Sequence, residues 1–95
     1  MFVHRAKIQL KPFSFTSLSQ KIQDLITPLL RLQTGFCSGV TSIDTSWSTA
    51  TEDTYWKTKQ DAEAYELNGY LKVKKIISEV AVSDPVTSIF EDQSK

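Results

Sequence analysis

The feature that most constrains the fold is the segment of residues 47–66, WSTATEDTYWKTKQDAEAYE, in which a strand pattern is followed within two residues by a helix start. Residues 49–56 alternate between two faces, as the two-residue period of a strand requires. One face carries Ala50, Glu52, Thr54 and Trp56. Thr58 precedes Asp61 by three positions, which is the spacing of a capping box at a helix N-terminus. The segment therefore predicts a strand that turns directly into a helix, with Trp56 at the corner.

The chain before this segment predicts one strand and one helix. Residues 2–10 alternate as a strand does. The face directed at the core carries Phe2, His4, Ala6, Ile8 and Leu10, and the opposite face carries Val3, Arg5, Lys7 and Gln9. A helix is expected from Ser17, whose spacing to Gln20 fits a capping box. We expect a kink or an early end at Pro28, and an end at Gly35 in the left-handed conformation.

The remaining chain predicts two strands and a second helix. Residues 36–45 predict a strand, and residues 46–48 a hairpin turn into the strand at 49–56. The second helix is expected to run from Thr58 to about residue 82, with two shorter helices meeting at Asn68 and Gly69 as the alternative. Its apolar stripe comprises Ala62, Tyr65, Gly69, Val73, Ile76 and Val80. Residues 86–90 predict the last strand, and residues 91–95 a polar tail.

This order of elements, β-α-β-β-α-β, predicts one α+β domain over residues 1–95 with the ferredoxin-like topology. In that arrangement a four-stranded antiparallel sheet carries both helices on one face and leaves the other face open. We expect the open face to mediate a symmetric homodimer, since two-fold dimers are the commonest soluble assembly. The alternative is a monomer whose antiparallel sheet has one solvated face.

Composition excludes several classes of function. Eleven basic and eleven acidic residues cancel, so we expect no binding to nucleic acid or to a membrane surface. No apolar stretch approaches the about 20 residues of a transmembrane helix, and the charged N-terminus lacks the pattern of a signal peptide. Cys37 is the only cysteine, which excludes an intrachain disulfide and a cysteine metal cluster. A cytoplasmic protein is therefore expected.

His4 is the only histidine, and it is the side chain whose ordinary pKa lies nearest neutral pH. Its place on the core-facing side of the first strand directs it into any cleft beneath the helices. There it could take a proton from a phenol or hydrogen-bond a carbonyl. The alternative is a structural histidine near a strand start. No metal is expected, because one histidine without clustered carboxylates does not supply three or four ligands.

Aromatic residues offer a second kind of candidate. Trp56 can form the wall of a site for a planar ligand, or it can be core packing that holds the helix onto the sheet. Tyr65 lies on the apolar stripe and can present its hydroxyl to the same cleft, with packing as the alternative. Tyr70 lies one position past the stripe and is expected to be exposed. The acidic side chains are interpreted as a solvated rim with a charge bias at the helix start, and comprise Glu52, Asp53, Asp61 and Glu63.

These elements and one short motif resemble a known family, the antibiotic biosynthesis monooxygenase (ABM) domain group of the dimeric α+β barrel superfamily. The matching residues are the Gly35-Phe36 step, the run Tyr55-Trp56-Lys57-Thr58-Lys59, Asp61-Ala62 and Tyr65. The resemblance implies a dimer whose sheets form a barrel, with a cleft in each subunit between sheet and helices. Members with known activity include cofactor-independent oxygenases of phenolic polyketides and quinols, and haem-degrading enzymes. Trp56 matches the Trp of the family.

Two departures from the family narrow the expected activity. Asn68 is the only asparagine and lies in the second helix, so the catalytic Asn of the family has no counterpart. The second helix also lacks the proximal histidine of the haem-degrading members, which argues against haem oxygenation.

The expected function is therefore a cofactor-independent monooxygenase acting on a small aromatic or quinol-type substrate. His4 is the expected catalytic residue, Trp56 and Tyr65 are expected to bind the substrate, and no cofactor is expected. The alternative is a non-catalytic ligand-binding or accessory dimeric module.

Overall fold

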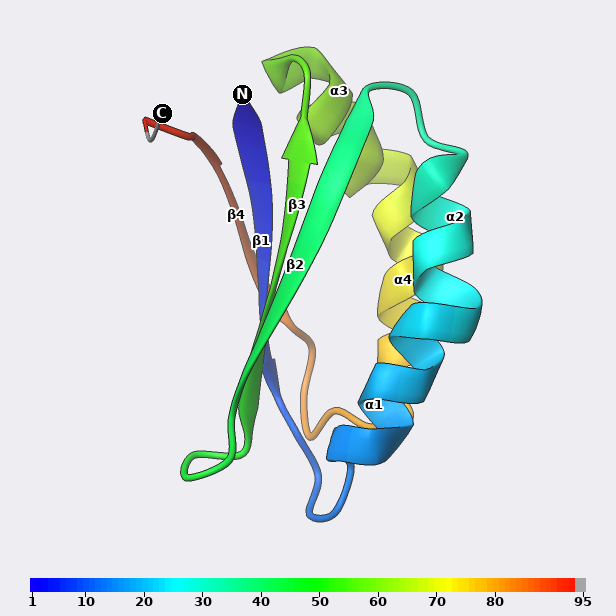
Figure 1. The fold of residues 1–95 in the computed structure, drawn as a ribbon, viewed down its shortest axis with the longest axis vertical. Coiled ribbons are helices and arrows are strands. Elements are labelled where there is room, and N and C mark those ends of the chain that lie inside the picture. The colour runs from blue at the N-terminus through cyan, green and yellow to red at the C-terminus, as the bar shows by residue number, and fades with distance from the viewer. Residues whose placement is uncertain (94–95) are drawn as a thin grey trace.

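The computed structural model of the chain describes residues 1–93. Its four strands form one antiparallel sheet in the order β2-β3-β1-β4. The strands are β1 (Phe2–Gln9), β2 (Phe36–Asp44), β3 (Thr49–Trp56) and β4 (Val86–Glu91). All helices lie on one face of this sheet, as Figure 1 shows. The ferredoxin-like α+β fold expected from the sequence is therefore confirmed.

Strand bounds agree with the pattern to within a residue at each end. Leu10, expected as the last residue of the first strand, instead forms an isolated bridge to Ala81. The second strand ends at Asp44, and residues 45–48 connect it to β3. Glu91, expected in the polar tail, belongs to β4, while residues 94–95 of that tail lie outside the described residues.

Each of the two helical runs contains a π-helical turn between two α-helical segments. The first run comprises α1 (Phe15–Lys21), η1 (Ile22–Ile26) and α2 (Thr27–Arg31). The second comprises α3 (Lys59–Ala64), η2 (Tyr65–Gly69) and α4 (Tyr70–Ile77). Both runs follow the length of the sheet (Figure 1). A π-helical turn closes its hydrogen bonds five residues back, so each one adds a residue to its helix.

The first run corrects two expectations. It begins at Phe15 after Ser14, so Ser17 is inside the helix and is not its N-cap. Pro28 does not end the run, because it lies in the first turn of α2, just after the π-helical turn. The Thr27 N–H bonds to Ile22 O, five residues back. Pro28 has no backbone N–H to donate to the preceding turn, and here that turn is the wider π-helical one. The helix therefore continues past Pro28 to Arg31.

The π-helical turn in the second run shifts the phase of its apolar stripe. The Tyr70 N–H bonds to Tyr65 O, five residues back, and the added residue rotates the remainder of the helix. As a result Tyr70 is only 3 % exposed, and the expectation that it is exposed was wrong. Ile77 is fully buried for the same reason, where strict α-helical spacing favours Ile76. The run ends at Ile77, several residues before the expected end.

The main core lies between the sheet and the two helical runs. The strand register pairs Phe2 with Trp56, Ala6 with Glu52 and Ile8 with Ala50, so the alternation read from the sequence sets which side chains face the helices. These side chains of β1 and β3 form the core together with residues from every helical segment. Its buried members include Leu18, Ile26, Leu30, Ala62, Tyr65, Val73 and Ile77.

Two short contacts hold the end of β3 against the start of α3. The Thr58 side chain accepts a hydrogen bond from the Asp61 N–H at 3.1 Å, which confirms Thr58 as the helix N-cap. Gly35 has a φ of +80°, as expected for a residue that ends a helical segment in the left-handed region. Its carbonyl accepts from the Lys57 N–H at 3.0 Å, and a Cβ there would meet Asp61 Oδ2. Only glycine fits this corner without strain.

Replacing Gly35 should therefore destabilise the protein, whereas a matched glycine should not. Gly35→Ala is expected to lower the free energy of unfolding by about 1–3 kcal/mol, because alanine is strained at positive φ and must displace Asp61. Gly39→Ala in β2 is the control, since the nearest heavy atoms to its added Cβ are 3.8 Å away. Urea denaturation of both variants measures the difference. Equal stability of the two variants would contradict this account of Gly35.

Candidate functional site

Trp56 and Tyr65, expected to line a ligand site, are in direct contact. Trp56 is fully buried at the end of β3, and its ring stacks on Tyr65 of η2 with centroids 4.7 Å apart. The Trp56 Nε1–H donates to Thr54 Oγ1 at 2.9 Å, and Thr54 in turn donates to His4 O at 3.3 Å. The ring of Phe36 also lies edge-on to the indole, with centroids 5.6 Å apart. The indole is therefore fixed in position by two rings and one hydrogen bond.

His4 joins the same cluster from β1. Its ring lies 4.9 Å from the ring of Tyr65 and 4.8 Å from the ring of Tyr70. Its Nε2–H donates to Glu66 Oε1 at 2.6 Å. The side chain of His4 is 2 % exposed and that of Glu66 is 34 % exposed, so the carboxylate links the buried imidazole to solvent. The structure thus brings together all three residues singled out from the sequence.

Burial decides the protonation state of this imidazole. Loss of hydration lowers the pKa of His4 below its usual value, while the hydrogen bond and charge of Glu66 act in the opposite direction. The neutral form therefore prevails at neutral pH. A neutral imidazole oriented by a carboxylate has the arrangement of a general base held by a third group.

Glu52 and Tyr70 are two polar residues of the same core that were assigned to the surface from the sequence. Glu52 is 4 % exposed and not part of a solvated rim, because its face of β3 is covered by the helices. Burial, assisted by the charge of Asp53, raises the pKa of Glu52 to about 7. Burial also raises the pKa of the Tyr70 hydroxyl. Glu52 could have been found in the sequence, since it alternates with Ala50, Thr54 and Trp56.

A small cavity opens beside the stacked rings. Its volume is about 120 Å³, and Trp56 and Tyr65 form its inner wall. The remaining lining residues come from the connection after α2 and from the second helical run, and are Gln33, Thr34, Asp61, Ala64 and Asn68. His4 is not among them, although its ring contacts Tyr65. Tyr65 therefore separates the cavity from the histidine.

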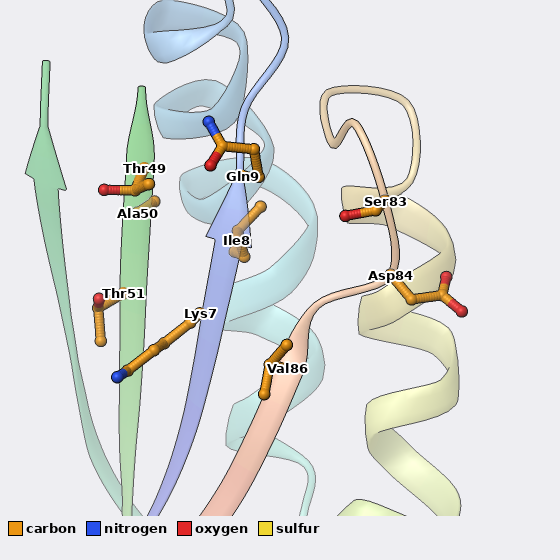
Figure 2. A pocket seen from close by; sticks show the side chains of 9 residues that line it. All are labelled: Lys7, Ile8, Gln9, Thr49, Ala50, Thr51, Ser83, Asp84 and Val86. Atoms are coloured by element: carbon orange, nitrogen blue, oxygen red, sulfur yellow. The ribbon is translucent and has the colours of Figure 1, made fainter. Parts of the chain in front are cut away.

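A larger cavity, of about 410 Å³, lies away from the aromatic cluster where β4 parts from β1 (Figure 2). The last β1–β4 pair is Lys7 with Val86. Further along β1, the Gln9 carbonyl accepts a hydrogen bond from the Val82 N–H, and residues 83–85 between these two contacts are not paired with β1. Lys7, Gln9, Thr49 and Thr51, four of its lining residues, alternate onto the open face of the sheet. In Figure 2 the Ser83 hydroxyl points toward the strands, whereas Asp84 points toward α4, where it pairs with Lys74 at 3.4 Å.

Neither a metal cluster nor a membrane-spanning helix is found in residues 1–93. No three His, Cys, Asp or Glu side chains gather there in an arrangement that could hold a metal ion. Within the same residues, no helix is both long enough and apolar enough to cross a membrane.

The fold matches several solved structures over nearly the whole chain. A monooxygenase of Streptomyces coelicolor, in complex with the ligand nanaomycin D, superposes with a TM-score of 0.81 at 13 % identity, covering 99 % of this chain and 88 % of that one. A candidate antibiotic biosynthesis monooxygenase of Bordetella bronchiseptica gives 0.79 at 13 % identity, with 96 % and 95 % covered. One from Deinococcus radiodurans gives 0.74 at 15 % identity, with 100 % and 95 % covered.

No protein-family model matches the chain, and no match was found among curated proteins. The resemblance to ABM-like proteins predicted from the sequence is therefore confirmed as a likeness of fold.

The buried carboxyl of Glu52 should make stability depend on pH. Its pKa is about 7 in the folded protein and about 4.5 when unfolded, so the folded state binds more protons between these values. Stability should therefore fall as pH rises through this window, by about 3 kcal/mol in total. Glu52→Gln removes that loss. Denaturation of both proteins across this pH window should show that the difference between their free energies of unfolding widens as pH rises. A constant difference would contradict the burial of the Glu52 carboxyl. Because His4 titrates in both proteins, it cancels in the difference.

Proposed function

We propose that this protein is an ABM-like, cofactor-independent monooxygenase that binds a small aromatic or quinol-type molecule between its sheet and its second helical run. The observation that carries the proposal is the stack of Trp56 on Tyr65 beside a cavity that opens to solvent. Stacked aromatic rings favour a planar ligand, because ring contacts add about 0.5–1.5 kcal/mol to the gain from buried area. The S. coelicolor monooxygenase of similar fold is in complex with the ligand nanaomycin D, which supports a small-molecule ligand for this protein.

Each residue singled out from the sequence takes a role in this proposal. Trp56 and Tyr65 form the wall against which the ligand stacks. His4 accepts a proton from the ligand or hydrogen-bonds its carbonyl, which its neutral imidazole and its bond to Glu66 support. Tyr65 must move for the ligand to reach His4, since its ring lies between the cavity and the imidazole.

The alternative function is a ligand-binding or accessory dimeric module without catalysis. The volume of the cavity beside Trp56, about 120 Å³, favours the accessory role. Pockets for small molecules usually measure about 300–1,000 Å³. Oxygen uptake in the presence of a bound quinol distinguishes the two functions, because the alternative predicts binding without uptake.

We also propose that the protein is a homodimer formed through the open face of its sheet. Arg5 on this face makes two hydrogen bonds to Asp53, both 2.8 Å long, and lies over the ring of Phe90. The face is more apolar than the sequence indicated, because β2 and β4 add exposed Val40 and Val86 to it. Apolar side chains with paired charges at their centre suit a self-complementary surface.

A charge placed on this face should separate the subunits. Val86→Glu puts a carboxylate on a side chain that is 70 % exposed, and burying it in the dimer would cost its hydration. Sedimentation velocity should then show a dimer for the native protein and a monomer for the variant. Leu32→Glu is the control, because Leu32 is 84 % exposed beyond α2, away from the sheet face. A native protein that sediments as a monomer would overturn the dimer.

Ligand binding should be visible through the fluorescence of Trp56. Titration with a panel of quinols, flavonoid-like phenols and haem should give saturable quenching with at least one phenol or quinol. The response should disappear in Trp56→Phe, because the ligand stacks beside the indole. Trp47→Phe is the matched control and should keep the response, since Trp47 is 75 % exposed in the turn after β2. A flat response across the panel would argue against an aromatic ligand in this cleft.

A further inference from the structure

The larger cavity takes no part in the proposed function. Its volume of about 410 Å³ falls within the about 300–1,000 Å³ of pockets for small molecules. It arises because β4 pairs with β1 only as far as Lys7, while residues 83–85 run beside the end of β1 without pairing with it. Polar side chains line both sides of this gap, as Figure 2 shows. The gap is therefore a place where a small polar molecule can bind between a strand and a loop.

Two cross-strand pairs form the wall of this cavity on the sheet. Lys7 lies opposite Thr51, and Gln9 lies opposite Thr49, with all four side chains on the open face. Opposite side chains of an antiparallel pair start about 4.5–5.5 Å apart at their Cβ atoms. One ligand group can therefore contact the Lys7 ammonium and the Thr51 hydroxyl together, and a second group can contact Gln9 with Thr49.

The ammonium of Lys7 is the charge that a ligand meets in this cavity. None of the ion pairs found within residues 1–93 includes Lys7. Asp53, on the same sheet face, accepts two hydrogen bonds from Arg5, both 2.8 Å long. Asp84 lines the cavity but points toward α4 in Figure 2 and pairs with Lys74 at 3.4 Å. Because both carboxylates have cations of their own, Lys7 is left to attract a ligand that carries a negative charge.

Gln9 can offer a ligand only an acceptor. Its Nε2 donates to Trp47 O at 3.0 Å and to Ser48 O at 3.1 Å, so both N–H groups of the amide are used. The amide oxygen remains for a ligand hydroxyl that donates to it. Residues two apart on one face of a strand are about 7 Å apart, which sets the separation between this hydroxyl and a negative group at Lys7.

The other side of the cavity supplies one hydroxyl and one apolar side chain. Ser83 points its hydroxyl toward the strands (Figure 2). Val86 lies opposite Lys7 at the start of β4 and is 70 % exposed, so a ligand that covers it removes apolar area from water. The ligand that fits therefore has a charged end, a hydroxyl and an apolar body.

We propose that this cavity binds a small organic monocarboxylate that also carries a hydroxyl group. Lys7 and Thr51 hold the carboxylate, and Gln9 accepts a hydrogen bond from the ligand hydroxyl. Ser83 donates to the ligand from the loop, and Val86 contacts its apolar body. The lining residues within residues 1–93 include one cation, which matches the single charge of a carboxylate better than the about −1.5 to −2 of a phosphate ester. The site is separate from the Trp56 cleft and does not depend on the proposed function.

Binding of para-hydroxybenzoate tests the proposal, because its carboxylate and hydroxyl lie at opposite ends of an apolar ring. Two-dimensional NMR of the isotope-labelled native protein should show saturable shifts of the backbone amides that line the cavity, those of Lys7, Gln9, Thr49 and Thr51. The neutral analogue para-hydroxybenzamide has the same shape and should bind at least about tenfold more weakly, because it lacks the charge that pairs with Lys7. Equal affinity for the two compounds would overturn the carboxylate site.

Lys7→Gln removes the ammonium from an exposed side chain and should weaken the binding of para-hydroxybenzoate at least about tenfold. Lys57→Gln is the matched control, because it removes the same charge from an exposed lysine just beyond the other end of β3. The control should bind with native affinity. An equal loss in both variants would show attraction by net charge alone and would overturn the site.

Ser83→Ala tests the loop side of the cavity and leaves unchanged the sheet face through which the homodimer is proposed. The loss of one neutral hydrogen bond should weaken binding about two- to tenfold. Sedimentation velocity of Lys7→Gln should match that of the native protein, and if its assembly differs, Ser83→Ala decides the result. Native affinity in Ser83→Ala and Lys7→Gln would overturn the proposal.

The location of the NMR shifts separates this site from the cleft of the proposed function. Shifts confined to Trp56, Tyr65 and their neighbours would overturn the inference and support the cleft. Saturable shifts in the cavity that persist in Trp56→Phe would support the inference independently of the cleft. Displacement of the probe by an equal concentration of inorganic phosphate would overturn the choice of a carboxylate, and the absence of saturable shifts would overturn the site.

Discussion

The stacking of Tyr65 on Trp56 is the contact on which the rest of the structure depends. It joins the end of β3 to the first turns of the second helical run, 4.7 Å between ring centroids. Thr54 fixes the indole from within the same strand, and the Thr58 cap begins the helix two residues later. These contacts direct the helical run over the sheet face that carries His4 and Glu52. The candidate site is thus a consequence of how one strand joins one helix.

Polar groups placed under this cover acquire their properties from burial. The loss of hydration lowers the pKa of His4 by more than Glu66 raises it, so the imidazole is neutral at neutral pH. Loss of hydration also raises the pKa of Glu52 to about 7. A core built for stability alone would fill these positions with apolar side chains. The Tyr70 hydroxyl is buried in this core without a hydrogen-bond partner among residues 1–93, which lowers the stability of the folded state.

Prediction from sequence succeeded where a pattern depended only on neighbours along the chain. The alternation in residues 49–56 predicted the bounds of β3 to the residue and placed Trp56 on the covered face, and the alternation in residues 2–10 placed His4 there. Prediction failed for Tyr70, because helix propensities do not indicate the π-helical turn that adds a residue just before it. It also failed for Glu52, whose charge suggested solvent although its position in the alternation indicated the core. The proton-transfer role of His4 stays a proposal.

The sequence by itself determined the order of elements, the two faces of each strand and the corner at Trp56, since strand alternation and helix capping are local properties. Only the tertiary structure decided what those faces meet. It decided which side of α4 faces the sheet and placed the ring of Tyr70 against that of His4. It also set the volume of the cavity beside Trp56, which is about 120 Å³. It also enclosed Glu52, because hydration is lost only when the helices cover the sheet. Protonation and access depend on that cover, so they follow from packing between segments distant along the chain.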